Sequence, residues 1–137
     1  MDTLTAEERS EVMSRVAGKN TRPELAVRRA AYALGYRYRL HRRDLPGCPD
    51  LTLAPLKKVI FVHGCFWHRH PGCPRTRTPK SNTDFWVKKF DQNVKRDRQS
   101  SASLHKAGWK VLTVWECQTE DELSLRRLLS RFLGRRS

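Results

Sequence analysis

A single stretch of the chain, residues 59–73, joins a strongly apolar run to a loop crowded with reactive side chains. Its first part, Val59 to His63, is a short β-branched and aromatic run that is typical of a buried strand. The loop that follows holds two cysteines, two histidines and two adjacent aromatic residues. We therefore expect a sheet whose open edge presents this loop, with the other segments arranged around it.

The segments on either side predict a mixed α/β fold in the order α-α-β-β-β-α-β-α. Strand-like runs occur at residues 36–40, 49–53, 59–63 and 109–115. Capping-box and glycine signals indicate helices at residues 4–18 and 22–34, a long helix from 83 to about 106, and a last helix that opens at Thr119–Glu122. We expect the 137 residues to form one domain.

The strands at 49–53 and 59–63 are close enough in sequence to pair as a hairpin around a turn at Pro55–Lys58. In the pairing that places Leu53 opposite Ile60, Asp50 lies opposite His63. An acid and a histidine would then share one open edge of the sheet.

The charge of the chain points to a polyanionic partner. Lys and Arg number 28 against 14 Asp and Glu, a formal net charge of +14, which favours nucleic acid over other polyanions. The sequence contains no run of about 20 apolar residues, so we expect no membrane span. The N-terminus lacks the features of a secretory signal. We therefore expect a cytoplasmic protein whose four cysteines bind metal rather than form disulfides.

The pattern Cys65-x4-His70-x2-Cys73 has the ligand types and density of a zinc site. A closed structural site needs a fourth ligand, and Cys117 is the best candidate because strand ends meet at one edge of a sheet. The alternative is that these cysteines are ordinary thiols. Cys48 is left over.

Asp50, His63 and His68 together indicate a hydrolytic centre. An aspartate is a hard oxygen ligand suited to Mg²⁺, and a histidine can take a proton from water near neutral pH. Taken alone, an aspartate at the start of a strand, such as Asp50, is more often a turn residue than a catalyst. Phe66 and Trp67 could either pack beneath the loop or form an apolar wedge that separates stacked bases.

Several ordered blocks of the chain resemble the Vsr family of very-short-patch-repair DNA mismatch endonucleases. The blocks are Arg9-Ser10 with Met13, Thr21 with Pro23–Leu25, Leu45–Asp50, Phe61–His70, Phe85-Trp86, Asn93–Asp97, Gly108-Trp109 and Val114–Cys117. The resemblance implies a restriction-endonuclease-like mixed sheet flanked by helices. It also implies nicking of double-stranded DNA 5′ to the thymine of a T:G mismatch, which arises when 5-methylcytosine deaminates.

The resemblance further implies roles for the motif residues. The active-site set would be Asp50, His63, His68, Glu24 and Asp97, with Mg²⁺ held by Asp50 and by the backbone carbonyl of Val62. The structural Zn²⁺ ligands would be Cys65, His70, Cys73 and Cys117. The DNA wedge would be Phe66 and Trp67 from the major groove and Met13 from the minor groove, so residues 1–20 would form a DNA-contacting arm on a catalytic core of residues 21–137.

Two positions depart from the family pattern: Val62 stands where threonine is common, and Cys48 stands where arginine is common. We expect a bacterial monomer associated with the nucleoid and possible cooperation with mismatch-repair proteins. Two other functions fit the same residues: a relaxed-specificity nickase of this fold, and a zinc-stapled protein that binds distorted DNA without cutting it.

Overall fold

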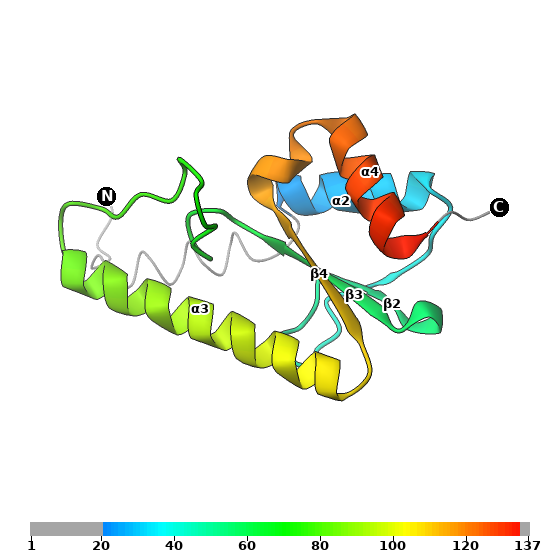
Figure 1. The fold of residues 1–137 in the computed structure, drawn as a ribbon, viewed down its shortest axis with the longest axis horizontal. Coiled ribbons are helices and arrows are strands. Elements are labelled where there is room, and N and C mark those ends of the chain that lie inside the picture. Colours follow the sequence, from blue (N-terminus) through cyan, green and yellow to red (C-terminus); the bar gives the residue numbers. More distant parts are fainter. Residues whose placement is uncertain (1–20, 135–137) are drawn as a thin grey trace, which may run out of the picture.

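The computed structural model describes residues 21–134, and these form a four-stranded mixed sheet between two layers of helices (Figure 1). The helices are α2 (Arg22–Ala33), α3 (Thr83–Lys106) and α4 (Glu122–Leu133). The strands, in their order across the sheet, are β1 (Arg39–Leu40), β2 (Leu51–Leu53), β3 (Lys58–His63) and β4 (Lys110–Trp115). The predicted α/β fold is confirmed over this range. The helix predicted at 4–18 lies outside the described residues.

The sheet divides the core into two parts because successive side chains of a strand point to opposite faces. Ile60 packs with the residues of α2 and α4 on one face, and its neighbours Val59 and Phe61 pack on the other face with Leu104 of α3. All four side chains are buried. None of the helices in residues 21–134 is long and apolar enough to cross a membrane.

The pairing of β2 with β3 differs from the predicted register by two residues. Leu51 lies opposite Ile60, and Leu53 lies opposite Lys58. The connection is a short 3-10 helix, η1 (Ala54–Leu56), closed by Lys57 in the left-handed region at φ 55°, so β3 begins at Lys58. The predicted pairing of Asp50 with His63 is therefore wrong.

Two element boundaries also differ from the predictions. Only Arg39 and Leu40 of the predicted strand 36–40 pair with β2; Tyr36 instead donates a hydrogen bond from its hydroxyl to the backbone oxygen of Leu133, at 2.9 Å. Thr119 ends a second 3-10 helix, η2 (Glu116–Thr119), in which its hydroxyl donates to the Glu116 carbonyl at 2.7 Å. α4 therefore begins after Asp121 rather than at the predicted capping box.

Gly47 fixes the loop before β2 against α3. Its φ is +75°, and a Cβ placed there would lie 2.7 Å from Cβ of Ser100 and 3.1 Å from Cε1 of Phe61. We expect Gly47→Ala to lower the free energy of unfolding by about 1–3 kcal/mol or more, from crowding added to backbone strain. Urea denaturation would measure the loss.

Gly108→Ala is the matched control, because Gly108 also has a positive φ, of +90°, but a Cβ placed on it would meet nothing within 4 Å. The difference between the two variants isolates the crowding. Equal losses would mean that the close approach to α3 has no energetic weight.

Candidate active site and cysteine–histidine cluster

A cleft of about 830 Å³ opens beside the carboxyl end of β3. Its walls come from the start of α2, the loop before β2, the end of β3 with the following loop, and the middle of α3. The predicted site residues that line it are Asp50, Val62, His63, Phe66, Trp67, His68 and Asp97. The fold thus brings most of the predicted active-site residues to one cavity.

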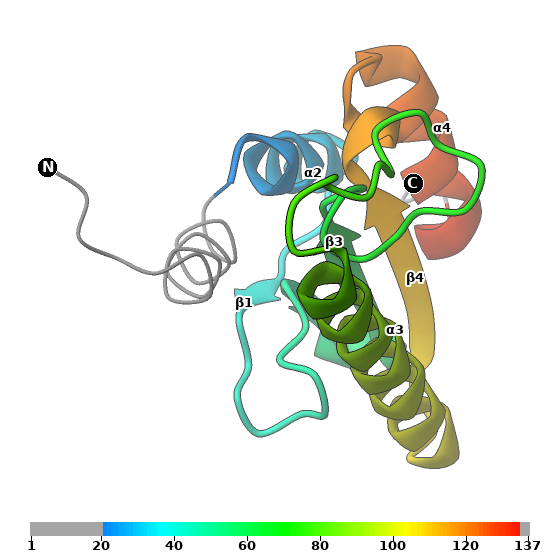
Figure 2. The same ribbon diagram turned by 90° about the vertical axis from the view of Figure 1, so that its left-hand side faces the viewer.

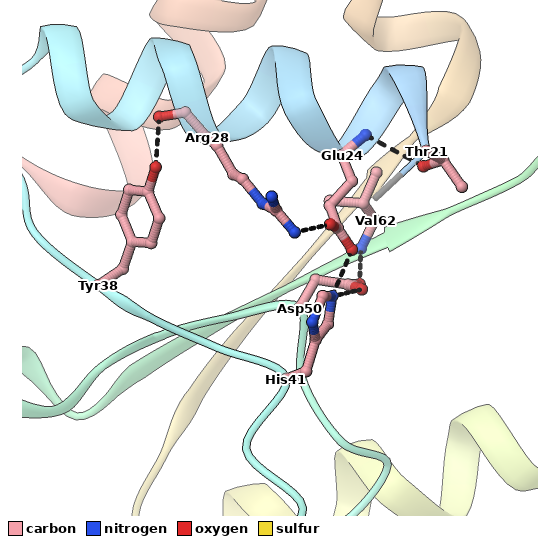
Figure 3. A network of polar contacts seen from close by, with 7 residues as sticks. All are labelled: Thr21, Glu24, Arg28, Tyr38, His41, Asp50 and Val62. Carbon is pink, nitrogen blue, oxygen red and sulfur yellow. Dashed lines mark hydrogen bonds and ion pairs between the residues drawn. The ribbon is translucent and has the colours of Figure 1, made fainter. Parts of the chain in front are cut away.

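Glu24, His41 and Asp50 form a polar group (Figure 3), and His41 and Asp50 of this group line the cleft. Nε2 of His41 lies 2.7 Å from Oε1 of Glu24 and 3.8 Å from Oδ1 of Asp50. The Val62 backbone N–H donates to Oδ2 of Asp50 at 2.6 Å. The guanidinium of Arg28 pairs with Oε2 of Glu24.

Glu24 reaches this group from the first turn of α2, which begins at Arg22. The Thr21 hydroxyl accepts a hydrogen bond from the Glu24 backbone N–H at 3.3 Å, as the capping signal predicts. The carboxylate of Glu24 turns away from the cap and into the buried group, where it is 2% exposed. One residue thus belongs both to the helix start and to the site.

The two carboxylates of this group titrate very differently. Burial, with the adjacent Glu24 carboxylate, raises the pKa of Asp50 to about 8. Burial acts to raise the pKa of Glu24 as well, but hydrogen bonds with Asp50 and His41 and the charge of Arg28 lower it overall. At neutral pH the negative charge of this pair therefore lies mainly on Glu24, and a cation bound beside Asp50 would favour its ionisation.

His63, His68 and Asp97 form a second polar group on the same cleft. Nδ1 of His68 lies 2.7 Å from Oδ2 of Asp97, while Nδ1 of His63 is 3.9 Å from the same oxygen. The two imidazole rings stack with centroids 3.8 Å apart and planes 8° apart. Because an ionised carboxylate only accepts hydrogen bonds, Asp97 fixes the proton of neutral His68 on Nδ1 and leaves Nε2 as the basic nitrogen.

The predicted single centre of Asp50, His63 and His68 is divided between two separate groups that line one cleft. His41, which no sequence motif singles out, belongs to the group that contains Asp50. Its position follows from the antiparallel pairing of Leu40 with Leu51, which brings His41, after Leu40, opposite Asp50, before Leu51. The His41 backbone N–H donates to the Asp50 carbonyl at 3.2 Å.

A cysteine–histidine cluster lies at the ends of the parallel strands β3 and β4. One ligand atom from each of Cys65, His70, Cys73 and Cys117 lies within 4.8 Å of the others. Nδ1 of His70 is 3.7 Å from the Cys65 sulfur and 3.4 Å from the Cys117 sulfur. This donor set suits zinc, and the predicted convergence of Cys117 with the loop is what the structure shows. Burial raises the pKa of Cys65 to about 12.

Trp115 lies between the cluster and the histidine pair. Its ring stacks on His70 with centroids 4.4 Å apart and meets His63 edge-on at 5.5 Å. The Thr76 hydroxyl donates to the His70 carbonyl at 2.9 Å. The loop is thus braced from the sheet on one side and by its own backbone on the other.

Phe66 and Trp67 are half-buried, and they both line the cleft and pack on α3. The Phe66 ring meets the Phe90 ring edge-on, with centroids 5.1 Å apart, and the centroids of the Trp67 and Trp86 rings are 6.0 Å apart. The Arg69 guanidinium covers Phe90 at 4.0 Å. The two readings from sequence, packing and a cleft-facing wedge, are therefore both compatible with this position. Met13 lies outside the described residues.

The buried state of His63 predicts acid sensitivity. Burial, with His68 acting in the same direction, lowers the pKa of His63 from 6.5 to about 4. Below pH 6.5 the unfolded chain takes up a proton that the folded chain refuses, so stability falls as the pH is lowered towards 4. Between pH 7 and 4.5 we expect this histidine to cost about 2 kcal/mol.

Urea denaturation of the wild type and of His63→Gln at both pH values would measure the free energy of unfolding that each loses between pH 7 and pH 4.5. The difference between the two losses is the contribution of His63. His105→Gln is the control, because it changes an exposed histidine in the last turn of α3. Its free energy of unfolding should fall by as much as that of the wild type when the pH is lowered. If His63→Gln also loses as much as the wild type, His63 is not the group responsible.

Comparison with known proteins links this cleft to a family. The family model described as DNA mismatch endonuclease Vsr matches residues 1–74. The chain is 47% identical over 132 residues to the type II nicking enzyme V.XorIIP of Xanthomonas oryzae pv. oryzae, covering 93% of this chain and 96% of that protein.

Two further relatives agree. The type II nicking enzyme V.NmeAIP of Neisseria meningitidis is 41% identical over 132 residues, covering 96% of this chain and 94% of that protein. The DNA mismatch endonuclease Vsr of Escherichia coli is 39% identical over 109 residues, covering 80% of this chain and 69% of that protein. The cleft, its acidic and histidine groups, and these similarities lead to one conclusion: the chain is an endonuclease and belongs to the Vsr family.

Proposed function

We propose that this endonuclease nicks double-stranded DNA 5′ to the thymine of a T:G mismatch, by Mg²⁺-dependent hydrolysis, in very short patch repair. The observation that carries the proposal is that Asp50, one of a close pair of carboxylates, and an aspartate-oriented histidine, His68, line the same cleft. Hydrolysis of a phosphodiester needs positive charge at the phosphate and a base for the attacking water. This cleft offers residues suited to both.

The donor set on the acidic wall fits a divalent cation. Asp50 and Glu24 each direct one carboxylate oxygen towards the same point, and the Val62 backbone lies beside them. When bound, Mg²⁺ would neutralise charge at the scissile phosphate. We propose Asp50 and the Val62 carbonyl as its protein ligands, so that valine at this position serves as well as threonine, and Glu24 as the acid that supports them.

In the second polar group of the cleft, we propose His68 as the base. Asp97 holds Nδ1 of His68, and the side chain of His68 remains 29% exposed, so Nε2 is available to take a proton from water. His63 is 11% exposed and its low pKa keeps it uncharged at neutral pH. Stacked on His68, it keeps the plane of that ring fixed and the site free of a second positive charge.

We expect His68→Ala to reduce the rate of nicking by about 10²–10⁴-fold, the usual contribution of a general base. Binding of the T:G duplex, measured by gel shift, should change little. His105→Ala is the control for a histidine outside the cleft. Nicking at the wild-type rate by both His68→Ala and Asp50→Ala would rule out this centre.

Selectivity for the mismatch would come from the aromatic wall. Phe66 and Trp67 could enter the base stack, supported from behind by α3 and Arg69. A T:G pair unstacks more easily than a Watson–Crick pair, which favours its selection. The net charge of +14 would bring the protein to DNA with strong salt dependence.

We also propose that residues 1–20, including Met13, form an arm on the DNA, that residues 21–137 form the catalytic core, and that the protein acts as a monomer before other repair proteins. Zn²⁺ in the cysteine–histidine cluster would hold the loop that carries Phe66 and His68.

Nicking assays on T:G and T:A duplexes with identical flanks, in Mg²⁺ or in EDTA, test the proposal. Cleavage of T:G alone, and only with Mg²⁺, is the expected result. Equal cleavage of both duplexes would indicate a relaxed-specificity nickase. Binding without cleavage under any condition would indicate a non-catalytic DNA-binding protein.

A further inference from the structure

The acidic wall of the cleft contains a nitrogen donor that the predicted Mg²⁺ site does not need. Each carboxylate there has one oxygen held by a fixed donor: Oε2 of Glu24 by Arg28, and Oδ2 of Asp50 by the Val62 N–H. The other oxygen of each, Oε1 and Oδ1, faces Nε2 of His41, at 2.7 and 3.8 Å. Two oxygens and one nitrogen thus converge (Figure 3).

The backbone fixes His41 in this position. Its φ of +47° lies in the left-handed region, which a residue other than glycine seldom adopts. Its N–H is bonded to the Asp50 carbonyl, so the imidazole is carried by the strand end next to the aspartate itself. The side chain is 16% exposed. The ring is therefore part of the buried wall and not a surface residue that happens to lie nearby.

The chemistry of the three donors favours a particular class of cation. Carboxylate oxygens suit Mg²⁺, Ca²⁺ and Mn²⁺, whereas imidazole suits first-row transition ions and is a poor ligand for Mg²⁺. We propose that His41 is a ligand in the cation site and makes this site prefer a first-row divalent transition ion, such as Mn²⁺, over Mg²⁺. The inference rests on the proposed function, because it concerns the cation of the same cleft.

A purely supporting role for His41 is the competing explanation. In that case Nε2–H would keep donating to Glu24 when the cation is bound, and no nitrogen would touch the ion. The distinction is whether a histidine nitrogen lies in the first coordination sphere, which pulsed electron paramagnetic resonance of bound Mn²⁺ detects through its coupling to ¹⁴N.

The experiment uses the full-length, zinc-loaded protein with Mn²⁺ as the probe. We expect ¹⁴N modulation in the wild type, its replacement by a ¹⁵N pattern when histidine is ¹⁵N-labelled, and its loss in His41→Gln. His68→Gln, which alters the other polar group of the cleft, and His105→Gln should both retain it. The labelled wild type needs no substitution and tests for nitrogen ligation even if His41→Gln folds poorly.

A second measurement is the competition between Mg²⁺ and bound Mn²⁺. His41→Gln should reduce the preference for Mn²⁺ over Mg²⁺ about tenfold, because it removes a nitrogen ligand that suits the transition ion and that Mg²⁺ does not use. An unchanged preference, modulation that persists in His41→Gln, a wild type without histidine nitrogen coupling, or no Mn²⁺ bound with or without DNA would each overturn the inference.

Failure of the proposed function has a different signature. It appears as the absence of nicking with every cation, whereas failure of this inference leaves Mg²⁺-supported nicking in place and removes only the role of His41 in ion preference.

Discussion

Asp50→Asn is expected to abolish nicking and, at the same time, to stabilise the metal-free protein. Loss of the charged oxygen should reduce the nicking rate about 10³-fold or more, because a bound cation contributes several kcal/mol of charge stabilisation. The gain in stability follows from burial, which with Glu24 raises the pKa of Asp50 from 3.8 to about 8. Single-turnover nicking and thermal unfolding in EDTA measure the two effects.

The sign of the stability effect follows from proton binding. Between about pH 4 and pH 8 the unfolded chain has released the Asp50 proton while the folded chain retains it, so wild-type stability falls as the pH rises through this range. Asparagine does not have to take up a proton when the chain folds. At pH 7.5 the free energy of unfolding of the variant should therefore exceed that of the wild type by on the order of 2 kcal/mol.

Asp44→Asn is the matched control in the same loop, because Asp44 is exposed and pairs with Arg42. It should leave nicking unchanged and add no stability. If Asp50→Asn is less stable than the wild type in EDTA at this pH, the carboxylate is not strained in the metal-free cleft.

Removal of zinc is expected to have the second large effect. We expect about one zinc per chain in reduced wild-type protein, and Cys73→Ser should lose most of it, together with stability on the order of 3 kcal/mol or more, because the binding energy of a structural metal is folding energy. Nicking should fall with it, since His68 and Phe66 lie on the same loop. Elemental analysis and thermal unfolding measure these losses.

Cys48→Ser is the natural control, because Cys48 lines the cleft but is not one of the four clustered residues. It should keep its zinc and unfold at nearly the wild-type temperature. Much less than one zinc per chain in carefully reduced wild type would contradict the four-ligand assignment. Because thiolates are the ligands, and burial raises the pKa of Cys65 to about 12, zinc affinity should weaken as the pH is lowered.

Features fixed by local sequence or by sheet geometry could be predicted. The long helix Thr83–Lys106 appears as expected, and so does the meeting of Cys117 with the loop from Cys65 to Cys73. The second prediction needed only the fact that β3 and β4 run side by side, and they pair in parallel along six residues.

Features that depend on register could not be predicted in the same way. A 3-10 turn shorter than the expected loop shifted β2 by two residues relative to β3, and this moved Asp50 away from His63. The role of His41 depends on a further pairing, that of a two-residue strand with β2. Such short pairings are set by tertiary packing, and no pattern in the strand itself specifies them.

Because β3 and β4 pair in parallel, the candidate site lies at one end of the sheet and the other end is separate from it. Both strands end beside the loop that follows β3 (Figure 2), close to the cleft and the cysteine–histidine cluster. The segments that precede the two strands, residues 54–57 and 107–109, therefore lie at the opposite end of the sheet. Lys110 donates its N–H to the Lys57 carbonyl there, at 2.9 Å. Leu56 is 39% exposed, and a Cβ placed on Gly108 would meet no atom within 4 Å. A fluorophore or a surface tether attached at Leu56 would therefore allow single molecules of this protein to be followed along DNA without disturbing the cleft.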